Sequence, residues 1–180
     1  MVLPIVAYGD PVLRKVGVEI DKDYSNLEEL IENMKVTMKN ARGVGLAAPQ
    51  IGKAIRLFIV DTSPFSDDGF KKVFINAKIT KEEGNEWAFS EGCLSIPNIN
   101  EDIFRNEKLT IEYYDENFKK HTEKLDGLAA RVVQHEYDHI EGILFTDKLS
   151  SLKKRLLKKK LNNISKGNID VDYRMKFPKK

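Results

Sequence analysis

The segment Gln134-His135-Glu136-Tyr137-Asp138-His139 contains the residue types of a hydrolytic metal site. On a helix, residues four apart lie on one face about 6 Å from each other, so His135 and His139 can bind one metal ion. Glu136 follows His135 directly and can reach a water on that metal without being a ligand. The spacing therefore indicates metal-assisted hydrolysis with Glu136 as general base.

A catalytic metal usually takes three protein ligands and leaves a fourth position for water, so a third ligand is needed. Neither common metallopeptidase pattern supplies it. The next helical segment, 151–163, has no carboxylate, and Phe145 stands where a third histidine would follow Gly142. The residues alone leave three candidates: His121, Asp147 and the single cysteine, Cys93. A polar hairpin surrounds His121, which makes it the weakest of them.

Three helices are predicted around these residues. The metal-binding helix follows Asp126-Gly127 and ends before Gly142, with Leu128, Val132, His135 and His139 on one face. An earlier helix is predicted to begin at a capping box, Ser25-Asn26-Leu27-Glu28, and its apolar face comprises Leu27, Leu30, Ile31, Met34 and Met38. A third helix, 151–163, is predicted to bury Leu152, Leu156, Leu157 and Leu161 and to expose six Lys and Arg residues.

Short strands are predicted between the helices. Residues 4–14 read as an extended entry segment, and β-branched and aromatic content predicts strands at 55–61, 73–76, 86–89 and 109–114, with 118–125 as a hairpin partner. The loop 43–52, Gly-Val-Gly-Leu-Ala-Ala-Pro-Gln-Ile-Gly, is small and almost uncharged. Its glycines allow a close backbone approach, as in the wall of a substrate cleft, although a tight turn is the simpler alternative. The loop lacks the Gly-Lys-Ser/Thr ending of a phosphate loop.

The length of 180 residues predicts one catalytic domain, with a basic C-terminal tail at 163–180. Residues 151–180 hold 11 Lys and Arg against 2 Asp, a net charge of +9, whereas the rest of the chain carries −7. The patterns leave open whether residues 170–177 add a terminal strand or hang free. No signal peptide or membrane span is predicted, and a lone cysteine is typical of a reducing compartment, so we expect a cytoplasmic protein.

Three motifs together resemble those of peptide deformylases, in the same order: Gly43–Gln50 (GVGLAAPQ), Glu91–Ser95 (EGCLS) and Gln134–Gly142 (QHEYDHIEG). The likeness extends from about residue 4 to about residue 160. It implies an α+β fold with small antiparallel and mixed sheets packed around a central metal-binding helix. It also implies one divalent metal ion held by Cys93, His135 and His139. Ferrous iron is the physiological ion that the resemblance favours, and zinc, nickel or cobalt can occupy such a site.

The resemblance implies removal of the N-formyl group from the starting methionine of newly made polypeptides, which releases formate. Metal-bound water would attack the formyl carbon with Glu136 as general base, while the Gln50 amide and the Leu94 backbone N–H hold the oxyanion. The implied substrate-binding residues are Gly43, Val44, Gly45, Arg131 and Val132. Gly45 would align the substrate as an added strand, and Val44, Val132 and the Arg131 stem would line the methionine slot. Asp138 is expected to pair with Arg105.

Two alternatives remain open beside this enzyme. A metallo-endopeptidase would cleave internal peptide bonds, and a non-enzymatic RNA-binding factor would use the metal structurally. The basic helix at 151–163 raises the second alternative, but it also fits a deformylase. We expect it to contact the ribosome surface, from which N-formylmethionyl chains emerge.

Overall fold

The computed structural model describes residues 1–66 and 69–178. Its helices are α1 (Leu27–Asn40), α2 (Gly127–Ile140) and α3 (Ser151–Ser165). Its strands are β1 (Ile5–Val6), β2 (Gly45–Ala47), β3 (Leu57–Asp61), β4 (Lys71–Cys93), β5 (Ile96–Tyr114), β6 (Lys120–Asp126) and β7 (Met175–Lys176). Single 3₁₀ turns lie at Pro11–Arg14, Ala48–Ile51 and Phe145–Lys148.

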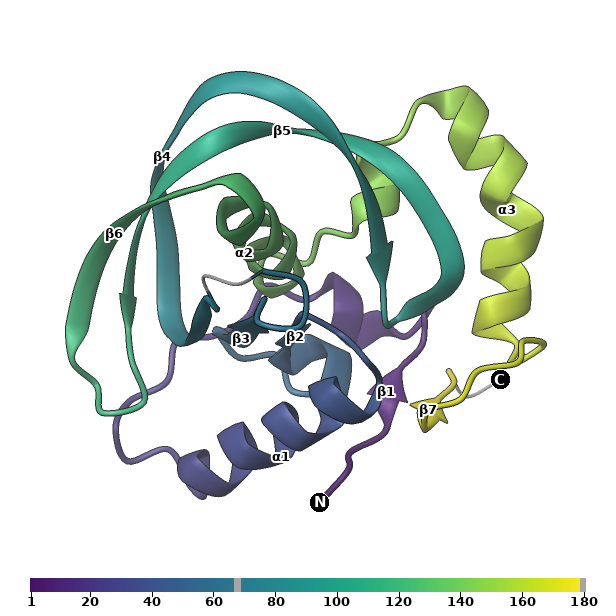
Figure 1. Cartoon of the computed structure of the whole chain (residues 1–180). Helices are drawn as coiled ribbons and strands as arrows, with labels where there is room; N and C mark the ends of the chain where they lie inside the picture. The colour runs from purple at the N-terminus through teal and green to yellow at the C-terminus, as the bar shows by residue number, and fades with distance from the viewer. Residues whose placement is uncertain (67–68, 179–180) are drawn as a thin grey trace.

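The main sheet is antiparallel, with the strand order β2-β3-β4-β5-β6, and a second small sheet pairs β1 with β7 in parallel. In Figure 1, β4 and β5 arch around α2, which lies at the centre of the molecule, while α1 lies outside the short strands β2 and β3. The predicted α+β fold, with small antiparallel and mixed sheets around the metal-binding helix, is confirmed.

Both faces of the short strands are buried by helices. The apolar face of α1 packs against β2 and β3, because Met34, Leu46 and Leu57 belong to one core cluster. The apolar face of α2 packs on the other side through residues such as Val133, which clusters with Phe58 and Phe74. The short strands thus lie between α1 and α2, and the sheet supports α2 along its buried face.

The predicted strands 73–76 and 86–89 are parts of one strand of 23 residues, β4, and the prediction at 109–114 covers only the end of β5. Between the two predicted segments, the pairing register of β4 with β5 changes at three places. These lie between Ile75 and Lys78, between Ile79 and Lys81, and between Glu83 and Glu86. Most side chains from 80 to 90 are exposed or half-buried, so no apolar alternation marks this arm. Backbone pairing with β5, rather than burial, holds it extended.

Two helix details predicted from the sequence are wrong. The N-cap of α1 is Asn26 in the left-handed region, with φ of 56° and no side-chain cap, rather than Ser25 in a capping box. On α3, Leu157 and Leu161 are buried, but Leu152 is 58% exposed and Leu156 71% exposed. Leu156 is rotated by about 100° from Leu157 on the helix, so a second leucine stripe faces away from the core.

The C-terminal segment forms a terminal strand, which answers a question that the sequence left open. Ile5 lies opposite Met175 and Val6 opposite Lys176, and the Ala7 N–H donates to the Lys176 carbonyl at 2.9 Å. The last two residues of the predicted basic tail, 179 and 180, lie outside the described residues. Among those described, no helix combines the length and apolarity needed to cross a bilayer.

Candidate metal centre

Cys93, His135 and His139 lie together, and their ligand atoms are all within 4.8 Å of one another. Cys93 is the last residue of β4, and the two histidines lie one turn apart on α2. The Cys93 Sγ is 3.4 Å from the His139 Nε2. Three soft and borderline donors converging from two elements form the ligand set of a transition-metal site.

The other two candidate ligands are paired elsewhere. The His121 Nε2 lies 2.6 Å from the Asp115 Oδ2, in the hairpin between β5 and β6. His121 is half-buried rather than freely solvated. Asp147 accepts hydrogen bonds from the Arg14 guanidinium. Of the three candidates, the structure therefore brings only Cys93 to the histidines.

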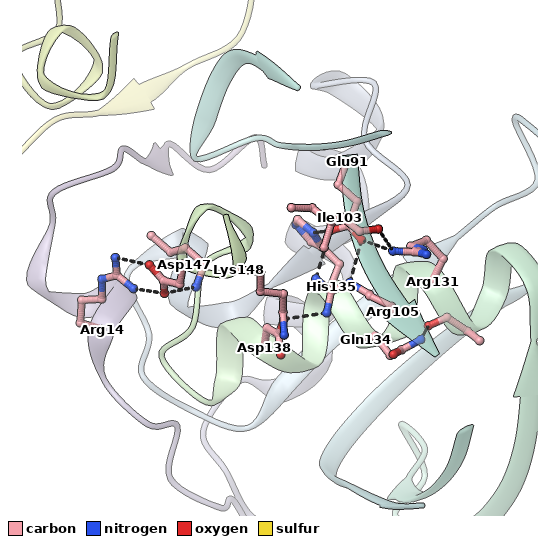
Figure 2. A network of polar contacts seen from close by, with 12 residues as sticks. Arg14, Glu91, Ile103, Arg105, Arg131, Gln134, His135, Asp138, Asp147 and Lys148 are labelled. Atoms are coloured by element: carbon pink, nitrogen blue, oxygen red, sulfur yellow. Dashed lines mark hydrogen bonds and ion pairs between the residues drawn. The ribbon is translucent and has the colours of Figure 1, made fainter. Parts of the chain in front are cut away.

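Glu91 lies at the centre of a buried ion-pair network beside the metal ligands (Figure 2). It accepts two hydrogen bonds from Arg105, at 2.7 and 3.0 Å, and one from Arg131 at 2.9 Å. Arg105 also donates to Asp138 at 2.8 Å, so the predicted Arg105–Asp138 pair is present. Burial opposes the ionisation of Glu91, but hydrogen bonds from His135 and Arg105 outweigh it and lower the pKa of Glu91.

The same network sets the orientation of the metal-binding imidazoles. The His135 Nδ1 lies 3.0 Å from the Glu91 Oε2, which leaves its other ring nitrogen for a metal. Burial lowers the pKa of His139 well below its usual value, so its ring is neutral and able to bind a metal. The donor set and its supporting carboxylate fit a divalent metal ion.

Glu136 is buried beside this ligand set, and its Oε2 has no hydrogen-bond partner among the described residues. Burial raises the pKa of its carboxyl to about 7. Gly45 lies against the carboxyl group, because a Cβ built on Gly45 would be 2.3 Å from the Glu136 Oε1. Such a group can accept and release a proton near neutral pH.

The Gln50 side chain is held in one orientation. Its Oε1 accepts the Ala47 N–H at 2.9 Å, so its amide NH₂ points the other way. This Nε2 lies 3.5 Å from the Cys93 Sγ and 3.3 Å from the Ser95 Oγ. Gln50 therefore presents hydrogen-bond donors to the region around the thiol.

A cleft of about 830 Å³ opens in front of the metal ligands. The residues predicted from the sequence that line it are Gly43, Val44, Gly45, Gln50, Cys93, Leu94, Arg131, Val132, His135 and Glu136. His139 lies behind them and is 1% exposed. Strand β2, which begins at Gly45, is an edge strand of the main sheet, so its outer edge faces this cleft.

The guanidinium of Arg131 is buried as well as its stem, although only the stem was predicted to line the slot. Besides Glu91, it donates to the Trp87 carbonyl at 2.7 Å and lies over the Trp87 ring at 4.6 Å. Phe89, on the same strand, lies 5.7 Å from the guanidinium and lines the cleft. Arg131 therefore ties the wall of the cleft to the Glu91 network.

No role was predicted from the sequence for Glu91 or for the cleft residues Phe65, Phe89 and 170–173. A signal for Glu91 was present, because residues two apart on a strand point to the same face and Glu91 precedes Cys93 by two. No local pattern connects residues 170–173 with Cys93.

Comparisons with known proteins agree with this geometry. Residues 2–155 match the family model of polypeptide deformylase. The chain is 64% identical over 190 residues to the peptide deformylase of Christiangramia forsetii, covering 99% of this chain and 97% of that protein. It is 65% identical to the peptide deformylase of Flavobacterium psychrophilum over the full length of both chains, 193 aligned positions with 100% coverage of each.

Solved structures extend the similarity to the whole fold. The crystal structure of a peptide deformylase from Legionella pneumophila matches with a TM-score of 0.84 at 36% identity, covering 93% of this chain and 98% of that one. The peptide deformylase of Thermus thermophilus matches with a TM-score of 0.84 at 40% identity, covering 93% of this chain and 99% of that one.

Proposed function

The chain belongs to the polypeptide deformylase family, and on this premise we propose how its residues remove the N-formyl group from the starting methionine of newly made polypeptides. The reaction is the hydrolysis of an amide, and its products are formate and a free amino terminus. The observation that carries the assignment is the buried Glu136 carboxyl beside the Cys93, His135 and His139 group in one cleft.

Cys93, His135 and His139 would hold one divalent metal ion, which supplies Lewis acidity and lowers the pKa of water. We assign ferrous iron as the physiological ion, although the same donors accept zinc, nickel or cobalt. Metal analysis of protein purified without oxygen tests the assignment. Iron in stoichiometric amount is expected, and zinc in its place would contradict it.

Glu136 acts as the general base. Its carboxylate takes a proton from the attacking water and then delivers it to the leaving nitrogen. Burial and the pKa of about 7 support this role, because such a group exchanges protons at neutral pH with little cost. The absence of a side chain at Gly45 leaves room for the carboxylate at the wall of the cleft.

The Gln50 amide and the Leu94 backbone N–H stabilise the developing oxyanion. The Ala47 N–H fixes the Gln50 amide, so its donors are oriented before substrate binds. Leu94 follows Cys93 directly in the two-residue turn between β4 and β5, which brings its N–H to the same end of the cleft. Preoriented donors of this kind need no reorganisation during the reaction.

The free edge of β2 aligns the substrate backbone as an added strand, beginning at Gly45. Val44, Val132 and the stem of Arg131 line the slot for the methionine side chain, since all three face the cleft. Gly43 contributes by its lack of a side chain, because a Cβ there would lie 2.7 Å from the Leu94 Cδ1.

The basic outer face of α3 contacts the ribosome surface, and the reaction takes place in the cytoplasm, where new chains begin. The Lys and Arg residues of α3 support this, together with the exposed Leu152 and Leu156 on the same helix. Cosedimentation with ribosomes tests the contact. It should weaken as salt concentration rises, because phosphate contacts release counterions. Salt-independent binding would contradict it.

Formate release from a short formyl-methionyl peptide tests the catalytic assignment, with the iron-loaded protein beside a Cys93→Ala variant. Rapid release by the wild type and none by the variant is expected. Tight metal binding without formate release, or cleavage of internal bonds in unformylated peptides, would refute the assignment and favour an endopeptidase.

A further inference from the structure

The segment after α3 returns to the active-site cleft and forms part of its wall. Residues 170–173 line the cleft together with the turn that follows Cys93. The Asn98 side chain donates to the Asp170 carbonyl at 3.2 Å, and Asp172 forms an ion pair with Arg42 across the cleft mouth. Pairing of β7 with β1 anchors the segment on its other side (Figure 1).

Within this segment, Tyr173 contacts the residue that follows the metal-binding cysteine. Its hydroxyl donates to the Leu94 carbonyl at 2.8 Å. The next carbonyl in the turn, that of Ser95, accepts the Tyr8 N–H at 2.9 Å. Tyr8 follows β1, which pairs with β7, so the two chain termini together hold both carbonyls of the Leu94-Ser95 turn.

The side chain of Leu94 is also held in place by packing. Its Cδ1 lies so close to Gly43 that a Cβ there would be 2.7 Å away, and both Leu94 and Tyr173 pack against the core cluster beneath α1. Burial, followed by the charge of Cys93, raises the pKa of Tyr173, so its oxygen carries a proton at neutral pH and acts as the donor. The contact is therefore a neutral hydrogen bond to a backbone group.

We infer that Tyr173 is a positioning residue for catalysis: its hydroxyl, through the Leu94 carbonyl, fixes the turn that carries the Cys93 thiol and the Leu94 N–H. The inference rests on the proposed oxyanion role of Leu94. A two-residue turn between long strands can rotate its peptide groups, and a hydrogen bond to one carbonyl selects one orientation. In this chain the C-terminal segment is thus part of the active site.

The test is the variant Tyr173→Phe, which removes the hydroxyl and keeps the ring packing. Tyr24→Phe is the matched control, because Tyr24 is half-buried against the same core cluster and its hydroxyl makes no hydrogen bond among the described residues. For Tyr173→Phe, kcat should fall about five- to tenfold while KM stays within about twofold, since a neutral hydrogen bond is lost from the transition state. Tyr24→Phe should match the wild type.

Cobalt-substituted protein supplies a readout that does not depend on turnover. The thiolate-to-cobalt absorption band reports the geometry at Cys93, and it should shift in Tyr173→Phe but not in Tyr24→Phe. A kcat within about twofold of the wild type together with an unshifted band would overturn the inference. A loss of bound cobalt, or an unfolding temperature well below that of Tyr24→Phe, would indicate a merely structural role and would also overturn it.

Failure of the proposed function has a different signature. A wild-type protein that releases no formate refutes the deformylase assignment, and the cobalt band then decides the role of Tyr173 alone.

Discussion

The carboxyl group of Glu136 occupies the space in which a side chain at Gly45 would lie. A Cβ built on Gly45 falls 2.3 Å from the Glu136 Oε1 and 2.7 Å from its Cγ. The glycine in the GVGLAAPQ motif is therefore required by a residue 91 positions later in the sequence. Contacts this close force one of the two groups to move if the glycine is replaced.

Gly45→Ala should displace the Glu136 carboxylate and lower kcat by about 100-fold, the order of magnitude of a general-base contribution. Steady-state formate release measures the loss. In the double variant with Glu136→Gln, alanine should add little further loss, because residues in contact are not additive. If the losses of kcat in the two single variants instead add up in the double variant, Gly45 acts independently of Glu136.

Glu136→Gln should retain the metal and the fold but lower kcat by about 1,000-fold or more, because an amide cannot accept the proton. The variant should also unfold at a slightly higher temperature. The Glu136 carboxyl group is buried and one of its oxygens has no hydrogen-bond partner among the described residues, so its ionised form is costly, whereas an amide carries no charge. Metal analysis, thermal unfolding and formate release check these results. Retained turnover would rule out Glu136 as the base.

Glu91→Ala should destabilise the protein by about 3–5 kcal/mol, because it leaves the buried guanidinium groups of Arg105 and Arg131 without their carboxylate. Metal affinity should fall by about 10- to 100-fold, since His135 loses the group that orients it. Urea unfolding and metal titration measure both effects.

Glu32→Ala is the control for this experiment. Glu32 is 61% exposed and pairs with Lys35, so its removal should change stability by less than about 1 kcal/mol. A similar loss of stability in Glu91→Ala and Glu32→Ala would mean that the buried Glu91 network contributes little to the stability of the fold.

The Arg14–Asp147 ion pair should contribute to the free energy of unfolding above about pH 4, and this contribution should be lost in acid. Burial favours the neutral acid, but hydrogen bonds from Arg14 and the Leu144 N–H prevail and lower the pKa of Asp147. A carboxyl whose pKa is lower in the folded state stabilises the fold above its unfolded pKa and loses this effect as pH falls through the folded pKa. Urea unfolding of wild type and Asp147→Asn should differ at pH 7 and converge near pH 2. A difference that persists in acid would exclude the ion pair as its source.

Removal of the metal should lower the unfolding temperature of the wild type, because a ligand that binds only the native state stabilises it. Cys93→Ala lacks one of the three donors, so a chelator should leave its unfolding temperature nearly unchanged. Scanning calorimetry with and without chelator compares the two proteins. An equal decrease in both would mean that the metal is bound elsewhere.

The sequence alone predicted the features that depend on local geometry. Residues 135 and 139 meet because a helix places i and i+4 on one face. The predicted apolar stripe did not identify the buried face, because Leu128 is only half-buried and the deepest residues of α2 are Ala130, Val133 and Ile140. The same reasoning gave the helix bounds around residues 127 to 141, which agree with α2. The assignment of Cys93 came from the resemblance of three motifs, and the residues by themselves left three candidate ligands open.

Tertiary structure decided the relationships between distant segments. Residues 80–90 of β4 have only exposed or half-buried side chains, so the length of this strand is set by backbone pairing with β5, which leaves no periodic signal. The second leucine stripe of α3, Leu152 and Leu156, resembles a core face but is exposed. Contacts such as Tyr173 with Leu94, 79 residues apart, depend on where the folded chain returns. Local periodicity encodes which face of an element is apolar, but only packing determines which element that face meets.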